Sequence, residues 1–384
     1  VVIKNTPEAE GISVTATLLN TGTNLYIQDV TLKNEWDYYG ISGDGRAVCL
    51  QDKGSKTICK NVSLLSYQDT YYTNNASGQY YWETSDIHGT VDFICGEGTL
   101  FVENSTITVE QRNSTGKGEC TITAPSTSES SNYGYVFSNC TIDNYAEKYN
   151  YGRAWNNAPR CAYINTIVSD DKIIDNRWTL AGMNSNPATA FVEYNTVDAD
   201  GTVVSPESHI VTFTANKSDA TNPDFETILT STEAANYTVD KVFTDWAPAE
   251  LAKQVDAPTV SIDGNTASWT AVDGAIAYLV FVDGELLSIT TNTEADLTTS
   301  TLKAASFTNN NVVVRAANAM GGLSATETTE TTPVISIVAN NAEVVGVEYY
   351  SILGQKLQAP SRGVCIVRTI FSDGSSKSTK LIVK

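Results

Sequence analysis

The sequence contains only two histidines, and its seven cysteines include no Cys-x-x-Cys pair. It therefore offers no convincing histidine-based triad and no zinc or dithiol motif. No run of apolar residues is long enough to span a membrane. The 24 Lys and Arg residues face 44 Asp and Glu residues, a formal net charge of −20. This balance argues against nucleic-acid binding and against anionic membrane surfaces. Because no acidic run has EF-hand spacing, we predict no metal site and no cofactor.

A chain of 384 residues with 41% hydrophobic content is long enough for two or three globular domains. Valine, isoleucine, threonine and tyrosine are abundant, which favours β-structure. The chain begins Val1-Val2-Ile3, without Met or a signal peptide, as though already inside a strand. We expect that further sequence precedes it. We expect most cysteines to pack as free, small apolar groups.

A short phrase, strand–Asp/Asn–strand, recurs through residues 1–170. Its Asp or Asn lies at positions 29, 61, 104, 139 and 165, so the intervals are 32, 43, 35 and 26 residues. Asx side chains tolerate bends and hydrogen-bond nearby backbone. A repeated corner with irregular intervals predicts a right-handed parallel β-helix whose loops vary in length, with an Asx ladder along one corner. The alternative is a sandwich of hairpins, which the scarcity of turns such as Asn-Gly disfavours.

The whole chain is predicted to be all-β, with three parts. Residues 1–250 form the β-helix. Residues 256–332 contain about seven short strands and one Trp, Trp269, and they resemble a fibronectin type III β-sandwich. Residues 333–384 form a small β domain that resembles the C-terminal tail domains of secreted Bacteroidetes proteins, which implies a role in secretion or sorting.

Three polar residues stand out in the β-helix segment. Arg46, Asp69 and Asp92 are each separated by 23 residues (69 − 46 and 92 − 69). Residues that are one coil apart in the sequence of a β-helix lie side by side in space. We therefore expect these three side chains to share one outer face. Strict alternation along the strands would then point Tyr71 outward and Cys95 into the core.

Two carboxylates on adjacent coils cannot both ionise cheaply, so the pKa of one is raised unless a cation stabilises it. Such a pair separates into an acid and an anion, which suits acid/base and nucleophilic catalysis. A neighbouring amide or guanidinium can hold a developing oxyanion. The plainer alternative is two solvated carboxylates on an exposed ridge. His88 is expected to be an ordinary turn residue.

Four segments resemble signature segments of the pectin methylesterases, in the family's order. They are Gly45–Leu50 (Gly-Arg-Ala-Val-Cys-Leu), Tyr67–Thr70 (Tyr-Gln-Asp-Thr), Gly89–Gly96 (Gly-Thr-Val-Asp-Phe-Ile-Cys-Gly) and Tyr151–Trp155 (Tyr-Gly-Arg-Ala-Trp). The resemblance covers roughly residues 1–247. The family fold is a right-handed parallel β-helix, in agreement with the repeated phrase.

The resemblance implies a role for each matching residue. Asp92 would attack the C6 carbonyl of a methylated galacturonate. Asp69 would protonate the departing methanol and then activate water, while Gln68 would donate to the oxyanion. Arg153 would keep Asp92 ionised and oriented.

Substrate contacts are expected from Trp155 and Trp178, which would stack on sugar rings, and from Tyr72 and Met183. Arg46 stands where the family has a second oxyanion-side Gln. It could still donate to the oxyanion, or it could pair with Asp69 and favour the ionised form of that carboxyl.

The favoured hypothesis is therefore a pectinesterase that acts on methylated homogalacturonan as a monomer. We expect it to be secreted, periplasmic or at the surface of a bacterial cell. The alternatives are a pectate lyase or polygalacturonase on the same scaffold, or a non-catalytic carbohydrate-binding or adhesive protein, because fold alone does not give function.

Overall fold

The computed structural model describes residues 1–40, 44–113, 118–184, 186–215, 224–298, 311–326, 344–351, 356–359, 363–371 and 376–383. The chain divides into two compact units, Val1–Glu327 and Thr328–Lys384.

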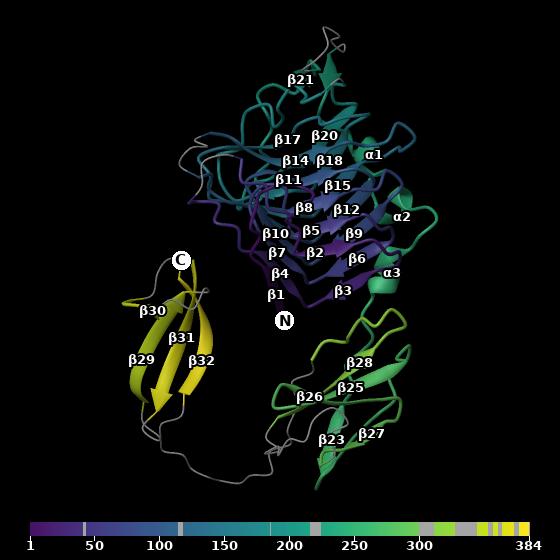
Figure 1. Cartoon of the computed structure of the whole chain (residues 1–384), viewed down its shortest axis with the longest axis vertical. Helices are drawn as coiled ribbons and strands as arrows, with labels where there is room; N and C mark the ends of the chain where they lie inside the picture. The colour runs from purple at the N-terminus through teal and green to yellow at the C-terminus, as the bar shows by residue number, and fades with distance from the viewer. Residues whose placement is uncertain are drawn as a thin grey trace. The chain divides into compact units, whose positions relative to one another are not determined.

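Three parallel sheets wind around a common interior in the first unit, and each full coil adds one strand to each sheet (Figure 1). Sheet 1 contains β1 (Val2–Asn5), β4 (Thr31–Asn34), β7 (Ser63–Leu65), β10 (Asp86–Gly89), β13 (Thr106–Val109), β16 (Thr141–Asn144) and β19 (Ile167–Val168). Sheet 2 contains β2 (Leu18–Asn20), β5 (Leu50–Asp52), β8 (Tyr71–Thr73), β11 (Val91–Gly96), β14 (Cys120–Pro125) and β17 (Tyr149–Gly152). Sheet 3 contains β3 (Tyr26–Gln28), β6 (Thr57–Lys60), β9 (Gln79–Glu83), β12 (Thr99–Glu103), β15 (Tyr135–Ser138), β18 (Arg160–Ile164) and β20 (Ala190–Tyr194). The predicted parallel β-helix is confirmed.

The corner between sheets 3 and 1 is built from residues in the left-handed conformation. All five predicted Asx positions have positive φ, from 49° to 56°. Asp and Asn adopt this conformation more readily than other residues with a side chain. The ladder is partly connected: Asn61 Nδ2 donates to Asp29 Oδ1 at 2.7 Å, and Asn165 Nδ2 donates to Asn139 Oδ1 at 3.3 Å.

The ladder also contains one corner that the repeated phrase does not reveal. Thr84 occupies it with φ 48°, and it divides the long interval between Asn61 and Asn104 into two coils. Asn195, with φ 55°, extends the ladder by one coil, and its Nδ2 donates to Asn165 Oδ1 at 3.0 Å.

Aromatic side chains fill the interior, where they stack both between register partners on successive coils, such as Phe137 and Tyr163, and between residues of different sheets. Tyr163 stacks between Phe137 and Tyr151, with ring centroids 4.6 and 3.9 Å away. Trp178 stacks on Phe191 at 4.6 Å. Six cysteines are free and buried, as expected: Cys49, Cys59, Cys95, Cys120, Cys140 and Cys161.

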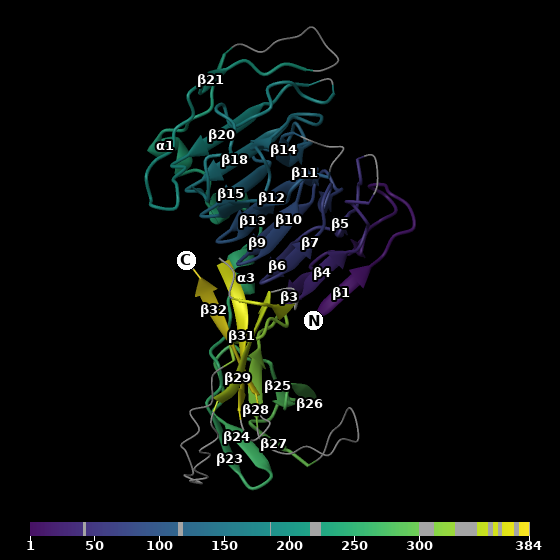
Figure 2. The same cartoon turned by 90° about the vertical axis from the view of Figure 1, so that its left-hand side faces the viewer.

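A returning segment covers the outer face of sheet 3. After the short antiparallel pair β21 (Ile210–Val211) and β22 (Phe225–Glu226), the chain forms α1 (Ser231–Ala234), α2 (Val239–Val242) and α3 (Pro248–Ala252) along that face (Figures 1 and 2). A second apolar cluster lies beneath this segment. Its members from sheet 3 include Ile58, Tyr81, Phe101 and Val136, and those from the segment include Phe243 and Trp246. Within the described ranges, no helix is long and apolar enough to cross a membrane.

Two three-stranded antiparallel sheets follow in the same unit. One contains β23 (Val260–Asp263), β24 (Thr266–Trp269) and β27 (Glu294–Asp296), and the other contains β25 (Ala277–Val282), β26 (Glu285–Thr290) and β28 (Val312–Ala317). They enclose an apolar cluster that includes Trp269 and Tyr278. The resemblance to a fibronectin type III module stays a prediction.

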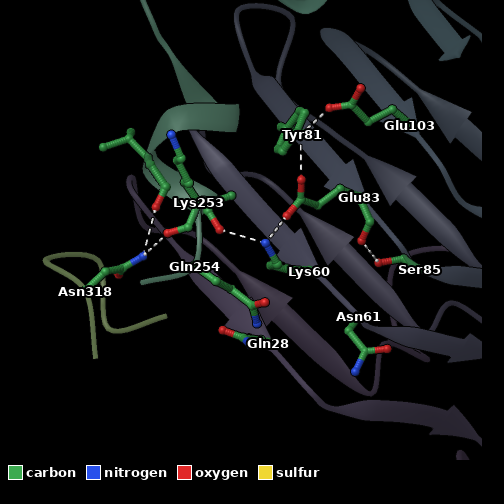
Figure 3. Close-up of polar contacts among 12 residues, drawn as sticks. Gln28, Lys60, Asn61, Tyr81, Glu83, Ser85, Glu103, Lys253, Gln254 and Asn318 are labelled. Carbon is green, nitrogen blue, oxygen red and sulfur yellow. Dashed lines mark hydrogen bonds and ion pairs between the residues drawn. The ribbon is translucent and has the colours of Figure 1, made fainter. Parts of the chain in front are cut away.

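This pair of sheets is tied to the first coils by polar contacts. Gln28 accepts from the backbone N of Leu323 at 2.9 Å, and Arg315 pairs with Asp29 at 3.0 Å. Figure 3 shows the adjoining network, in which Lys60 contacts Glu83 and donates to the Ala252 carbonyl at 2.8 Å.

The second unit contains one antiparallel sheet. Its order is β30 (Lys356–Leu357), β29 (Val344–Ser351), β31 (Gly363–Phe371) and β32 (Ser376–Val383).

His88 is a strand residue rather than the expected turn residue. It lies on β10, where its ring nitrogens are 2.7 Å from Asp86 Oδ2 and 2.7 Å from Glu110 Oε1. Burial opposes the imidazolium, but hydrogen bonds to the two carboxylates outweigh burial and raise the pKa of His88 to about 9.

The raised pKa predicts a loss of stability in mild alkali. Because the pKa of His88 in the folded protein lies above the ordinary histidine value of 6.5, the stabilisation is complete below pH 6.5 and disappears as the pH rises through 9. It amounts to about 3 kcal/mol at most. Thermal unfolding of His88→Gln should therefore show a smaller fall between these pH values than the wild type. Equal slopes for wild type and His88→Gln would contradict the prediction.

Candidate active site

Two buried aspartates lie side by side on sheet 2. Asp69 precedes β8 and Asp92 lies near the start of β11, and the two residues are only 5% and 6% exposed. The backbone N of Asp69 donates to the Val91 carbonyl at 3.2 Å, and Tyr71 is in register with Ile94. The 23-residue spacing therefore places these two carboxyls correctly on adjacent coils. Arg46 is bridged to Gln68 instead of Asp69, one position off the predicted register.

Both aspartates have left-handed backbone conformations, with φ of 60° at Asp69 and 50° at Asp92. This reverses the side-chain alternation just after each of them. Tyr71 joins the core instead of pointing outward, and Cys95 faces the site instead of the core. The two predictions from strict alternation were wrong because they assumed extended backbone at the aspartates. The Cys95 Sγ lies 3.9 Å from Asp69 Oδ1.

Arg153 binds Asp92 with a planar fork. Its Nε donates to Oδ1 at 2.8 Å and its Nη2 donates to Oδ2 at 2.6 Å. The segment after β17 is held in place because the backbone N of Arg153 donates to the Thr123 carbonyl at 3.0 Å. Two parallel charge-assisted bonds fix both the orientation and the charge of a carboxylate.

The two carboxyls have different electrostatic surroundings. Burial raises the pKa of Asp69 well above its ordinary value, and the charge of Asp92 raises it further, against opposing charges on Arg46 and Arg153. Burial also raises the pKa of Asp92, but the hydrogen bonds and charge of Arg153 counteract this rise. The arrangement therefore favours a proton on Asp69 and a negative charge on Asp92.

These carboxyls open into a pocket of about 240 Å³. Of the predicted residues, it brings together Arg46, Gln68, Asp69, Asp92, Arg153, Trp155 and Met183. Tyr72 lies beside this pocket, with its ring centroid 6.1 Å from that of Trp155. Among the described residues, no group of three or more His, Cys, Asp and Glu side chains is arranged to hold a metal ion.

Trp178 does not belong to the pocket, and its prediction as a sugar-stacking residue was wrong. Its side chain is 0% exposed. A parallel bridge with Gly152 places it on the coil above β17, where it packs against Tyr151, Tyr163 and Phe191. Its ring is therefore not accessible to a carbohydrate.

Arg46 pairs with Glu10 instead of Asp69. Its Nη2 lies 2.8 Å from Glu10 Oε1, and the other oxygen of Glu10 accepts from the backbone N of Gly45 at 2.8 Å. Glu10 lies in an irregular segment with no repeat or motif, so no sequence pattern identifies it as a site residue. The same holds for Ile12 and Asp44, which also line the pocket.

The chain matches the family model described as Pectinesterase over residues 3–245. The chain belongs to the pectinesterase family. It is 27% identical over 260 residues to pectinesterase A of Dickeya dadantii (strain 3937), a match that covers 62% of this chain and 70% of that protein. It is 31% identical over 171 residues to a pectinesterase of Ralstonia nicotianae, covering 41% of this chain and 43% of that protein.

A solved pectin methylesterase from carrot has the same fold. The superposition has a TM-score of 0.50 at 20% identity and covers 65% of this chain and 76% of that chain. As a pectinesterase, the protein is an enzyme that hydrolyses carboxylic esters.

The two tryptophans near the site should respond differently to truncation. Trp178→Ala should lower the free energy of unfolding by about 3–5 kcal/mol, because it leaves a large cavity in an aromatic column. Trp155→Ala should cost no more than about 1 kcal/mol, because Trp155 is half-buried at the pocket. Urea unfolding of the two variants measures the difference. Equal destabilisation would contradict this placement of the two rings.

Proposed function

We propose that this pectinesterase removes methyl esters from the galacturonate units of pectin, releasing methanol and acidic pectin, with Asp92 as the nucleophile. The observation that carries the residue assignment is the forked Arg153–Asp92 pair beside a second buried carboxyl that has no ion-pair partner among the described residues. One anion and one acid in a single pocket supply both steps of an acyl transfer.

In the first step, a carboxylate oxygen of Asp92 attacks the C6 carbonyl carbon, and the carbonyl oxygen becomes an oxyanion. Gln68 donates its side-chain amide to that oxygen. As the tetrahedral intermediate collapses, the bond to the methoxy oxygen breaks and Asp69 gives its proton to the leaving methanol. The product of this step is an acyl-enzyme in which Asp92 is joined to the galacturonate as an anhydride.

In the second step, the ionised Asp69 takes a proton from water as that water attacks the C6 carbonyl of the acyl-enzyme. The bond to Asp92 breaks, which restores the Asp92 carboxylate and the protonated Asp69 and releases free galacturonate. Arg153 holds Asp92 in one orientation through both steps. Trp155, Tyr72 and Met183 surround the place where a sugar ring would enter.

We further propose that the protein acts as a secreted, periplasmic or cell-surface monomer on methylated homogalacturonan. The division into a catalytic β-helix of residues 1–250, a sandwich of residues 256–332 and a sorting domain of residues 333–384 belongs to the same proposal.

Conservative substitutions at the two aspartates test the mechanism. Asp92→Asn should reduce methanol release from methylated pectin by about 10³-fold or more, because an amide does not replace the nucleophile. Asp69→Asn should reduce it by about 10²–10⁴-fold, because the general acid is lost. Asn tolerates the left-handed conformation, so both variants should fold.

Asp283→Asn is the matched control, since Asp283 has φ 51° but lies in the turn between β25 and β26. It should release methanol at the wild-type rate. A near-normal rate for Asp92→Asn would show that Asp92 is not the nucleophile. If the wild type instead gave unsaturated or shortened uronides without methanol, the reaction would be that of a lyase or a polygalacturonase. No chemical change in pectin would indicate a binding protein.

A further inference from the structure

The pocket contains two arginines, and each is held by a different carboxylate. Arg153 is bound by Asp92 through two hydrogen bonds. Arg46 is bound by Glu10, from a segment outside the sheets. Asp69, the residue that must carry a proton in the proposed reaction, has no ion-pair partner among the described residues.

Hydrogen bonds connect Glu10 and its neighbour Gly11 to Gly45 and Arg46. One oxygen accepts from Arg46 Nη2 and the other from the backbone N of Gly45, each at 2.8 Å. The backbone N of Gly11 in turn donates to the Arg46 carbonyl at 3.1 Å. The hydrogen bond from Arg46 is the largest cause of a lowered pKa at Glu10, so Glu10 stays ionised over the working pH range.

Arg46 is close enough to affect Asp69 if it were released. Its bridge partner on the next coil is Gln68, the residue directly before Asp69, and both Arg46 and Asp69 line the pocket. Its side chain is 42% exposed, and Glu10 is the ion-pair partner of its guanidinium among the contacts described. A guanidinium that moved onto Asp69 would stabilise the carboxylate and remove the acid from the reaction.

We propose that Glu10 is a positioning residue that holds the Arg46 guanidinium away from Asp69, so that Asp69 keeps the proton it delivers to the leaving alcohol. This inference rests on the proposed function.

The surroundings of Asp69 are consistent with this role. The charged and titratable groups that face it are Asp92, Arg46, Arg153, Asp44, Cys95 and Tyr72. Asp92 and Asp44 raise the pKa of Asp69, and the two arginines lower it. Arg153 is fixed by its fork to Asp92, so Arg46 is the cation whose distance from Asp69 a single neighbouring side chain can change.

The test is the pH profile of kcat/KM for methanol release. In the proposed mechanism, activity should fall on the alkaline side as Asp69 loses its proton. Glu10→Gln should move that alkaline limb to lower pH by about half a unit to one unit, a modest shift because the pair is partly exposed. The double variant Glu10→Gln/Arg46→Gln has no Arg46 guanidinium. Its alkaline limb should therefore return to the wild-type pH or lie at higher pH. Glu8→Gln, which removes an exposed carboxylate from the same segment, should leave the limb unchanged.

A second measurement does not depend on activity. The infrared carbonyl band of the protonated Asp69, assigned by its loss in Asp69→Asn, should titrate at lower pH in Glu10→Gln than in the wild type. An unchanged titration in Glu10→Gln would overturn the proposal. So would the same shift with and without Arg46, because it would mean that Glu10 only supports the backbone. A wild type that releases no methanol would defeat the proposed function, while the infrared titration would still decide the role of Glu10.

Discussion

The stacking of one coil on the next is the constraint on which the site depends. Strands of adjacent coils lie about 4.8 Å apart, so residues in register are forced into proximity whatever their charge. At Asp69 and Asp92 this brings together two carboxyls that are almost fully buried. Two buried negative charges at this separation would be costly. The fold resolves the conflict by giving one carboxyl a guanidinium fork and leaving the other to hold a proton, and that asymmetry is the source of the chemistry.

The left-handed backbone at both aspartates is the second element of this arrangement. It interrupts the alternation of the strands, so that Phe93 and Ile94 both lie in the core before Cys95 faces the pocket, and Tyr71 lies in the core after Asp69. An unfavourable backbone conformation of this kind persists only where the surrounding structure holds it in place, and it is common at functional sites. Here the neighbouring coils hold the conformation through backbone hydrogen bonds, such as the one from Asp69 N to the Val91 carbonyl.

Much of this could be predicted from the sequence, because a coiled fold converts spacing into proximity. The recurring Asx corners indicated the β-helix, and the 23-residue interval placed Asp69 beside Asp92. The fork between Arg153 and Asp92 followed from the family resemblance. The corner at Thr84 was hidden because its side chain is not Asx, although its backbone adopts the same conformation.

Other features depend on details that sequence patterns do not carry. Trp155 lies two residues after Arg153 and Trp178 directly follows Arg177, yet Trp178 is bridged to Gly152 and lies in the core. Strict alternation failed at Cys95 because it presumes extended backbone. Glu10 meets Arg46 through an irregular segment, and such a segment has no period from which a partner could be found.

The segment that covers sheet 3 has a consequence for biosynthesis. The sheet presents an apolar outer face, including Tyr81 and Phe101, which is covered by residues that come more than a hundred positions later, such as Phe243 and Trp246. A chain that emerges from the ribosome with its N-terminus first can stack its coils before this cover exists. During that interval the growing coil carries an exposed apolar face, the kind of surface on which partly folded chains associate. Synthesis through α3 is therefore the stage at which all the residues that cover this apolar face become available.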